Sequence, residues 1–454
     1  MDWINSALTM NNIINLSCLL TALLIIISCD SNKKVNSTSH VISDDSLLTK
    51  VQYQTFQYFW DGAEPNSGLA RERIHLDSIY PSNDQNVVTS GGSGFGIMAI
   101  LVGIERGFIT REQGVKRYQK ILDFLETADR FHGVWPHWWH GETGKVKPFS
   151  KKDDGGDLVE SSFLIQGLLC VREYFKNGNE EEKMIAQRID QLWKEVEFDW
   201  YTQGEDALYW HWSPNFGWEM DFNVQGYNEC LIMFVLAASS PTHSIDAEVY
   251  HKGWARNESL STDREYLGYK TIVDHYSGND SPVGPLFWAH YSYLGLNPKG
   301  LTDRYGNYWD VNRNHAMIHY THCVNNPNDY EGYGRNCWGL TSSYSMKGYA
   351  GHRPDKDLGV ISPTAALSSF PYTPEHSMDF LRYLYQDADS LVGKFGPYDA
   401  FSHEDDWYLP RYLAIDQGPI PVMIENYRTG LLWNLFMSAP EVKEGLMKLG
   451  FTNE

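Results

Sequence analysis

The sequence predicts an all-α protein, an (α/α)6 toroid built as a barrel of helical hairpins with long loops at one end. Apolar residues after Leu47 recur at helical spacing almost throughout the chain. The segments between the helical stretches are long and rich in Gly, Trp, His and Asp. No repeat of fixed period occurs, which argues against a solenoid. Strand signals are few, and the clearest lies around 207–212.

The individual helices are predicted from apolar periodicity and from residues typical of helix starts. Thr110 stands three positions before a Gln, Asp157 three positions before Glu160, and Pro374 and Pro440 suit first helical positions. We expect helices at 46–61, 93–106, 111–129, 158–176, 180–198, 223–238, 263–275, 284–294, 307–325, 361–369, 375–386, 417–437 and 440–448.

The N-terminal segment has the pattern of a bacterial lipoprotein signal. The apolar run 19–27 is short for a membrane span, and Ile26-Ile27-Ser28-Cys29 resembles a lipobox in which Cys29 receives the lipid. A short N-terminal anchor with an incidental Cys is the alternative. The polar stretch after Cys29 is typical of a tether. We therefore expect a signal peptide at 1–28, a tether at 29–45 and one catalytic-size domain at 46–454, in a periplasmic or outer-membrane lipoprotein of a diderm bacterium.

Composition narrows the class of ligand. The chain has 37 Lys+Arg against 58 Asp+Glu, a net charge of −21, which disfavours nucleic acid, an anionic membrane surface or a uronate polymer. Membrane contact is expected only through the lipid. Aromatic residues reach 14%, with 16 Trp. That surplus, combined with little basic charge, fits a neutral, flat-faced ligand such as a sugar.

Several other functional classes lack their motifs. Cys170, Cys230, Cys323 and Cys337 form no C-x-x-C pair, so a zinc site is disfavoured and buried, unpaired thiols are favoured. The glycines near residue 91 are not followed by Gly-Lys-Ser/Thr, and neither Gly-x-Ser-x-Gly nor His-Glu-x-x-His occurs. We expect no cofactor, no metal and a monomer.

The densest group of carboxylates is Asp153, Asp157 and Glu160, with two glycines between the first two. Asp157 and Glu160 are three residues apart at a helix start, so they can share a face. Crowded carboxylates raise one another's pKa and can keep one acid protonated near neutral pH. Two alternatives remain open for this pattern: a helix cap and a calcium loop.

Aromatic clusters flank this group on both sides. Val134–His140 contains Trp135, His137, Trp138 and Trp139, and 209–218 contains further tryptophans. Aromatic faces stack on pyranose rings, and His side chains bind hydroxyls. Core packing is the alternative for each single Trp.

Glu229 stands out as a carboxyl group within an apolar segment that we assign to the helix 223–238. Burial there favours a raised pKa and a general-acid role. The alternative is a buried Glu neutralised by an arginine, for which Arg71 and Arg428 are the candidates.

Long motifs in the chain, among them GGDLVESSFLIQGLL, YWHWSPNFGWEM, QGYNECLIMFVLAASSPTH and YLAIDQGPIPVMIENYRTGLLWNLFMSAPEV, resemble the bacterial glucoamylase-like family. Within it, the chain is similar to glycoside hydrolase family 144, the β-1,2-glucanases, from about Tyr53 to Phe451. The resemblance implies an (α/α)6 toroid and hydrolysis of β-1,2-glucan to short, sophorose-type oligosaccharides, with inversion and without a metal. The family's Asp-x-x-x-Asp-x-x-Glu pattern falls on Asp153, Asp157 and Glu160, and its Gly-Tyr-Asn-Glu motif on Glu229.

These observations give a specific set of expected roles. Glu229 is the predicted general acid and Asp157 the lead candidate for the base, with Glu160 and Asp153 shaping its pKa or relaying the proton. Asp399 is the further candidate for the base. The predicted sugar-binding residues are Arg71, His137, Trp138, Trp210, Trp212 and Trp338. Two other functions remain as alternatives: an α-glucan exo-hydrolase and a non-catalytic glycan-binding lipoprotein. A uronate lyase is disfavoured by the acidic charge.

Overall fold

The computed structural model describes residues 42–81, 84–275 and 281–453. Internal contacts divide the chain into Met1–Ile42 and Ser43–Glu454. The predicted signal peptide, the lipid-bearing Cys29 and most of the tether lie outside the described residues. All helices and strands of the described residues belong to the unit Ser43–Glu454.

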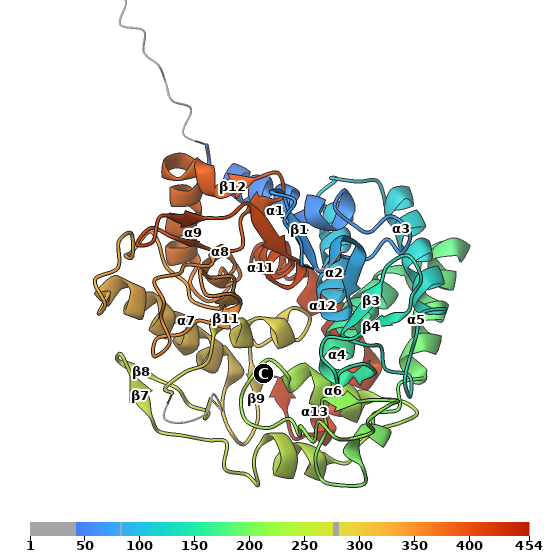
Figure 1. Cartoon of the computed structure of the whole chain (residues 1–454). Helices are drawn as coiled ribbons and strands as arrows, with labels where there is room; N and C mark the ends of the chain where they lie inside the picture. The colour runs from blue at the N-terminus through green and yellow to red at the C-terminus, as the bar shows by residue number, and fades with distance from the viewer. Residues whose placement is uncertain (1–41, 82–83, 276–280, 454) are drawn as a thin grey trace, which may run out of the picture. The chain divides into compact units, whose positions relative to one another are not determined.

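Figure 1 shows the helices of this unit arranged around a common centre; the colour passes around the ring from α1 to α9, and the C-terminal helices α12 and α13 lie beside α4 and α6. Helices α2, α4 and α6 are buried along nearly their whole length. By contrast, α3, α5 and α13 each expose a polar face. This difference is the signature of an inner and an outer layer, because only an inner helix has protein on every side. The expected toroid of helical hairpins is confirmed.

The helices have the following bounds in the structure: α1 Asp44–Trp60, α2 Ser90–Glu105, α3 Arg111–Leu125, α4 Leu158–Phe175, α5 Glu180–Lys194, α6 Leu231–Ser239, α7 Tyr308–Asn325, α8 Pro363–Leu367, α9 Pro374–Arg382, α10 Ala414–Gln417, α11 Pro419–Arg428, α12 Leu431–Ser438 and α13 Pro440–Lys448.

Helices α2 and α4 pack closely because glycines face each other at their contact. A Cβ on Gly94 would lie 2.2 Å from the carbonyl oxygen of Phe163, and one on Gly167 would lie 2.3 Å from that of Gly94. The glycine-rich start of α2 therefore serves helix packing and is not a phosphate loop.

Short strand pairs line the loops of the toroid. They are β1 Arg73–His75 with β16 Arg411–Leu413; β2 Val87–Thr89 with β3 Trp138–His140 and β4 Val146–Lys147; β5 Gly156–Asp157 with β6 His211–Trp212; β7 Glu265–Tyr266 with β8 Tyr269–Lys270; β9 Leu301–Thr302 with β17 Thr452–Asn453; β10 Ser342–Ser343 with β11 Ala350–Gly351; β12 Val392–Gly393 with β13 Gly396–Pro397; and β14 Phe401–Ser402 with β15 Trp407–Tyr408.

Four of the predicted helices differ in the structure. The segment 263–275 contains the hairpin β7–β8 in place of a helix, and 284–294 forms the 3₁₀ turns η4 Leu286–Ala289 and η5 Tyr291–Tyr293. Helix 417–437 is divided into α10, α11 and α12, with Gly430 at φ +72° between the last two. The predicted helix 223–238 begins only at Leu231, a difference that decides the position of Glu229.

Helix α1 begins two residues before the predicted domain boundary. Ser43 caps it by accepting a hydrogen bond from the Ser46 N–H at 3.3 Å. Asp44 and Asp45 then pair with Arg382 and Arg428 at 2.7 and 2.6 Å. These contacts tie the end of the expected tether into the folded unit.

Two further expectations concern the described part of the chain. Its cysteines Cys170, Cys230, Cys323 and Cys337 are free and buried, as predicted. Within the same residues no helix is both long and apolar enough to cross a membrane.

Candidate active site

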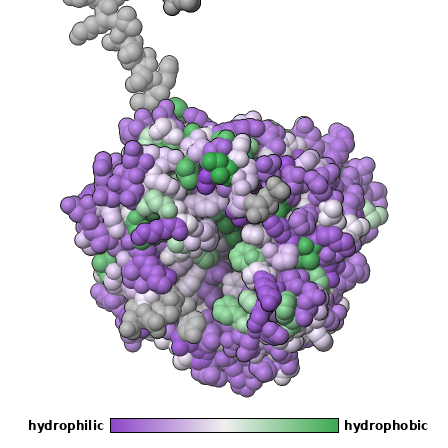
Figure 2. Space-filling view, in the orientation of Figure 1, coloured by the Kyte–Doolittle hydropathy of each residue, from purple (hydrophilic) through white to green (hydrophobic). Residues whose placement is uncertain are grey.

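A cavity of about 530 Å³ opens at the end of the toroid where several inner helices begin. Thr89 precedes α2, Glu160 lies in the first turn of α4, Glu229 precedes α6, and Ile415 lies in α10. Figure 2 shows a hollow in the middle of this face, with apolar and intermediate residues in it and a mostly hydrophilic surface outside. The lining consists of Glu72, Arg73, Thr89, His137, Trp138, Phe149, Glu160, Phe163, Trp210, Glu229, Phe287, Tyr291, Ser342, Tyr344, Tyr349, Leu413 and Ile415. The N-terminus of a helix carries a partial positive charge, so carboxylate groups are stabilised in this position.

Glu229 lies in a turn before α6 and not inside a helix, which corrects the prediction. Gly226 adopts φ +77°, and the side chain of Asn228 accepts a hydrogen bond from the Cys230 N–H at 3.0 Å. Such local side-chain bonds compete with helix formation. The resulting turn places the Glu229 side chain in the pocket wall.

No cation neutralises Glu229 among the described residues. Arg71 donates to the backbone oxygens of Gly62 and Ala63, both at 2.7 Å, and Arg428 pairs with Asp45. Burial therefore acts unopposed by a neighbouring positive charge and raises the pKa of Glu229 to about 7, with a further contribution from the charge of Glu160. The alternative of a structural Glu–Arg pair does not hold for this residue.

Glu160 is held by the N-terminus of α2. The Gly91 N–H donates to its Oε2 at 3.0 Å, and a Cβ on residue 91 would lie 2.2 Å from that oxygen. Burial raises the pKa of Glu160 to about 7, while the positive charge of His137 opposes the shift.

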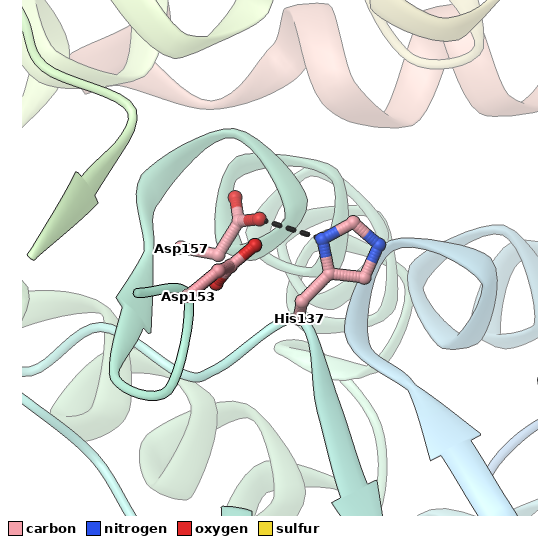
Figure 3. A group of neighbouring side chains, drawn as sticks. All are labelled: His137, Asp153 and Asp157. Carbon is pink, nitrogen blue, oxygen red and sulfur yellow. Dashed lines mark hydrogen bonds and ion pairs between the residues drawn. The ribbon is translucent and has the colours of Figure 1, made fainter. Parts of the chain in front are cut away.

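Asp157 combines a helix cap with an ion pair. Its Oδ1 accepts from the Glu160 N–H at 2.9 Å, and its Oδ2 lies 2.8 Å from Nδ1 of His137 (Figure 3). Burial would raise the pKa of Asp157, but the hydrogen bond and charge of His137 hold it below its usual value. For His137, burial would lower the pKa, yet the charges of Glu160, Asp157 and Asp153 raise it to about 9. The capping role and an electrostatic role thus coexist in Asp157.

Asp153 lies beside this pair, and His211 closes the group. His211 Nε2 is 3.2 Å from Oδ2 of Asp153 and 3.7 Å from Oδ2 of Asp157. Asp157 and His211 are partners across the β5–β6 pair. Among the described residues, one group of three or more His, Cys, Asp or Glu side chains has ligand atoms close enough to hold a metal ion. It consists of His137, Asp153 and Asp157. A calcium loop does not fit, because calcium prefers six to eight oxygen ligands and this group contains imidazoles.

A second group of carboxyl groups, Asp399, Asp416 and Glu72, lies near the pocket, and Glu72 is the member that lines it. Asp399 and Asp416 are buried and each affects the pKa of the other, and Oδ2 of Asp399 accepts from the Tyr344 N–H at 2.9 Å. Burial raises the pKa of Asp399 to about 6 and that of Asp416 well above its usual range. Neither oxygen of Asp416 has a hydrogen-bond partner by geometry among the described residues.

The sequence predictions gave neither Asp416 nor Glu72 a catalytic or binding role. The signal that could have singled out Asp416 is an acidic residue in the otherwise apolar YLAIDQGPIPVMI stretch. Tyr291 connects the two groups, because its pKa is raised by burial and by the charges of Asp416, Glu160 and Glu229. Both groups therefore have members near Tyr291, which lines the pocket.

Three of the predicted sugar-binding residues line the pocket: His137, Trp138 and Trp210. The ring of Phe149 stacks on His137 at 4.2 Å and meets Trp138 edge-on at 4.8 Å. Trp212 lies outside the lining, with its ring against His132 at 5.2 Å. The pocket thus has an aromatic side, formed by Trp138, Phe149 and Trp210, near its carboxylates.

Trp338 and Arg71 require corrections. Trp338 is fully buried, and its Nε1 donates to the His376 carbonyl at 3.2 Å, so it is a core residue and offers no face to a sugar. The Arg71 guanidinium donates hydrogen bonds to backbone oxygens of neighbouring turns, and Arg71 does not line the pocket. Residue type alone could not distinguish these two from the pocket residues.

A helical toroid with a carboxylate- and aromatic-lined pocket at the N-terminal ends of its inner helices is the arrangement expected of a glycoside hydrolase. A family model described as "Putative glucoamylase" matches residues 221–440. An endo-β-1,2-glucanase from Chitinophaga pinensis, solved with sophorotriose and glucose, is 63% identical, with a TM-score of 0.89 over 90% of this chain and 99% of that one. A structure from Bacteroides fragilis described as a putative glucoamylase is 57% identical, with a TM-score of 0.90 over 92% and 99%.

A curated relative from Parabacteroides distasonis, an exo β-1,2-glucooligosaccharide sophorohydrolase acting at the non-reducing end, is 47% identical over 92% of this chain. The chain spans 60% of that relative's length. An endo-β-1,2-glucanase from Talaromyces funiculosus shares the fold at a TM-score of 0.60 with 10% identity. The chain belongs to the putative glucoamylase family and groups within it with the β-1,2-glucanases of glycoside hydrolase family 144.

Proposed function

We propose that this chain hydrolyses β-1,2-linked glucan to short oligosaccharides with inversion at the anomeric carbon. The observation that carries the proposal is Glu229, a carboxyl group in the pocket wall with its pKa raised to about 7 and no cationic partner among the described residues. The relatives named as β-1,2-glucanases support the linkage. They include endo and exo enzymes, so the proposal leaves the mode of attack to the product pattern.

Glu229 is the proposed general acid. A carboxylic acid that remains protonated near neutral pH can donate to the glycosidic oxygen as the bond breaks. The aromatic rings of Trp138 and Trp210, which line the same pocket, suit the apolar faces of glucose units.

The general base accepts a proton from the attacking water. Asp157, the lead candidate from the sequence, has one oxygen bound by the Glu160 N–H and the other by His137, so it suits a positioning role better than proton transfer from water. The Asp399–Asp416 pair lies next to two residues that line the pocket, since Asp399 accepts from the Tyr344 N–H and Asp416 interacts with Tyr291. We propose that this pair supplies the base: Asp399 and Asp416 hold one proton between them, and the carboxylate that remains accepts the proton of the attacking water.

Incubation of the purified protein with linear β-1,2-glucan, followed by chromatography of the products, tests the function. Glu229→Gln, which preserves side-chain size, is the matched variant, and maltoheptaose is the control substrate. Short β-1,2-oligosaccharides that are lost in the variant support the proposal, and proton NMR of the fresh products gives their anomeric form. Cleavage of maltoheptaose alone would transfer the assignment to an α-glucan hydrolase. Binding without cleavage of either glucan would make the chain a glycan-binding protein.

We further propose that the chain is a monomeric lipoprotein of the periplasm or outer membrane, anchored at Cys29. The lipobox-like Ile26-Ile27-Ser28-Cys29 supports the anchor. Metabolic labelling with a radioactive fatty acid, compared between the natural chain and Cys29→Ala, tests the lipidation. Label retained in the variant would contradict it. Light scattering of the purified protein tests the monomer.

A further inference from the structure

Four aromatic rings outside the pocket form a group that the proposed hydrolysis does not use. They belong to His132, Trp200, Trp212 and Trp218, and we call the group the aromatic platform. Trp200 is 41% exposed, and the other three side chains are partly exposed. Core packing therefore does not account for these residues. Large aromatic side chains that stay exposed together are typical of a binding surface.

The rings of the platform hold one another in fixed orientations. The imidazole of His132 lies flat on Trp200, with the ring centroids 3.9 Å apart and the planes at 11°. Trp212 meets His132 edge-on at 5.2 Å, and the Trp218 ring lies 6.4 Å from that of Trp200. A surface that is ordered before its ligand arrives loses less conformational entropy on binding.

The backbone at His132 supplies a second observation. Phe131 and Val134 form an antiparallel bridge, so His132 and Gly133 are the two central residues of a tight turn, at φ +53° and +76°. Asn-Gly is the usual pair in such a turn, because both residues must adopt positive φ. The imidazole gives the turn no advantage, yet it stacks on Trp200. This choice of residue indicates that the side chain serves the platform.

The platform lies at the same end of the toroid as the pocket. Helices α2 and α4 begin at the pocket, and α3 and α5 return beside them after short loops, so α3 and α5 end where α2 and α4 begin. Figure 1 shows α3 and α5 on the outer side of α2 and α4. Arg188 of α5 pairs with Asp123 of α3 at 2.8 Å near the ends of the two helices. His132 follows α3 and Trp200 follows α5, so both lie at this end.

The platform is also continuous with the wall of the active site. Trp212 lies two residues after Trp210, which lines the pocket, and two residues of a strand span about 7 Å. The backbone N–H of Asp157 donates to the carbonyl oxygen of Trp135 at 2.9 Å. This bond ties the segment that carries His132 to the strand that carries Asp157.

The chemistry of the platform selects a neutral carbohydrate. Aromatic faces suit the C–H faces of pyranose rings. At its edge, the side chains of Glu197 and Asp199 are 38% and 56% exposed, and carboxylates accept hydrogen bonds from hydroxyls but repel a polyanion. A long glucan chain also exceeds a pocket of about 530 Å³, so part of the chain lies outside it.

We propose that His132, Trp200 and Trp212 form a second binding site for neutral glucan, which holds the part of a polymer chain that lies outside the pocket. Trp218 positions the ring of Trp200. The site increases the affinity for long chains without contact with the reacting atoms. The β-1,2 linkage of the bound chain rests on the proposed function.

Affinity electrophoresis of the full-length protein in gels that contain linear β-1,2-glucan measures the binding. Glu229→Gln serves as the background, so that the polymer is not cut. Trp200→Ala is expected to weaken the Kd about fivefold, the scale of one aromatic stacking contact, and Trp200→Tyr, which keeps a ring, to weaken it less. His132→Asn suits the turn and is expected to weaken the Kd without lowering the Tm.

Tyr53→Ala provides the matched control, since Tyr53 is 46% exposed on α1 and lies outside the platform. Its Kd should equal that of the background protein. Equal retardation of Trp200→Ala and the background protein would overturn the proposal. A dimer in light scattering that Trp200→Ala dissociates would also overturn it, because the platform would then bind a second copy of the chain.

Kinetics with two substrate lengths separate the platform from the pocket. In the active protein, Trp200→Ala is expected to raise KM for the polymer about fivefold relative to KM for a β-1,2-linked tetrasaccharide. An equal rise for both substrates would place Trp200 in the pocket and reject the second site.

Failure of the proposed function is recognised separately, as absence of hydrolysis of both substrates. Electrophoresis is then repeated in gels of α-glucan and β-1,3-glucan. Retardation in any gel that Trp200→Ala weakens and Tyr53→Ala does not would support the platform. Absence of retardation in all of the gels would overturn it.

Discussion

The backbone N–H of Gly91 donates to Oε2 of Glu160 at 3.0 Å, and a side chain at residue 91 would collide with that oxygen. The contact joins the N-terminus of α2 to the first turn of α4, the two helices that form the most closely packed pair of the inner layer. The pocket carboxylate at Glu160 is therefore positioned by helix packing.

Gly91→Ala is predicted to lower kcat/KM at least tenfold, because the added Cβ must displace the Glu160 carboxylate from 2.2 Å. Overpacking of this kind costs about 1–3 kcal/mol of stability. Gly334→Ala is the control, since a Cβ there meets no atom within 4 Å and Gly334 is not at positive φ. Equal activities of the two variants in a glucan assay would show that the absence of a side chain at residue 91 is not needed to position Glu160.

The pH profile of hydrolysis is predicted to fall on its alkaline side through Glu229. The acid acts in its protonated form, and burial raises its pKa to about 7, so activity is present below pH 7 and is lost as pH rises. Above that value kcat/KM should decrease about tenfold per pH unit. Initial rates in buffers of constant ionic strength measure this alkaline limb of the pH profile. A limb that persists unchanged in the residual activity of Glu229→Gln would assign it to another group.

Asp416→Asn is predicted to reduce kcat by about 100-fold or more, the contribution typical of a general base, with little change in KM. Asp157→Asn should instead keep an oxygen that caps α4 but remove the charge that pairs with His137, and lower the free energy of unfolding by about 1–3 kcal/mol. Kinetics and urea denaturation of both variants separate the two roles. A larger loss of kcat in Asp157→Asn, with stability unchanged, would return the role of base to Asp157.

Two tryptophans predicted as sugar platforms should respond differently to truncation. Trp338→Ala removes a fully buried ring and is expected to cost about 3–5 kcal/mol of stability, with KM unchanged in the protein that folds. Trp210→Ala changes the pocket lining and is expected to raise KM for glucan with a smaller effect on stability. Thermal melts and KM values for both variants provide the comparison, and a matching rise in KM for Trp338→Ala would place that ring at the sugar.

Buried histidines are predicted to make the fold sensitive to acid. Burial lowers the pKa of His315 to about 4 and that of His290 to about 3, against 6.5 for an exposed histidine. The unfolded chain binds these protons first, so their contribution is complete above pH 6.5 and is lost as pH falls towards 4. The slope is at most about 1.4 kcal/mol per pH unit for each group.

Urea denaturation between pH 7 and 4.5 measures this slope. His315→Gln should reduce it, whereas His243→Ala, at a partly exposed histidine, should not. An identical slope in the natural protein and in His315→Gln would show that other groups control acid stability.

The sequence by itself determined the helical class, most helix positions and the carboxylates Asp153, Asp157, Glu160 and Glu229. Apolar periodicity and local capping are properties of short segments, so they can be read along the chain. The turn at Glu229 was not predicted because the helical pattern of the apolar residues 231–238 was extended back to residue 223. The positive φ of Gly226 and the side-chain hydrogen bond of Asn228 give residues 226–230 a turn conformation in place of a helix.

The tertiary structure alone decided which polar and aromatic residues share the pocket. Asp416 and Glu72 are distant in sequence, yet in the folded chain the charge of Glu72 contributes to the raised pKa of Asp416. Trp338 and Trp210 are the same residue type, and only packing places one in the core and the other in the pocket. Burial and the convergence of inner-helix N-termini set these roles, and both depend on contacts between segments that the order of residues does not specify.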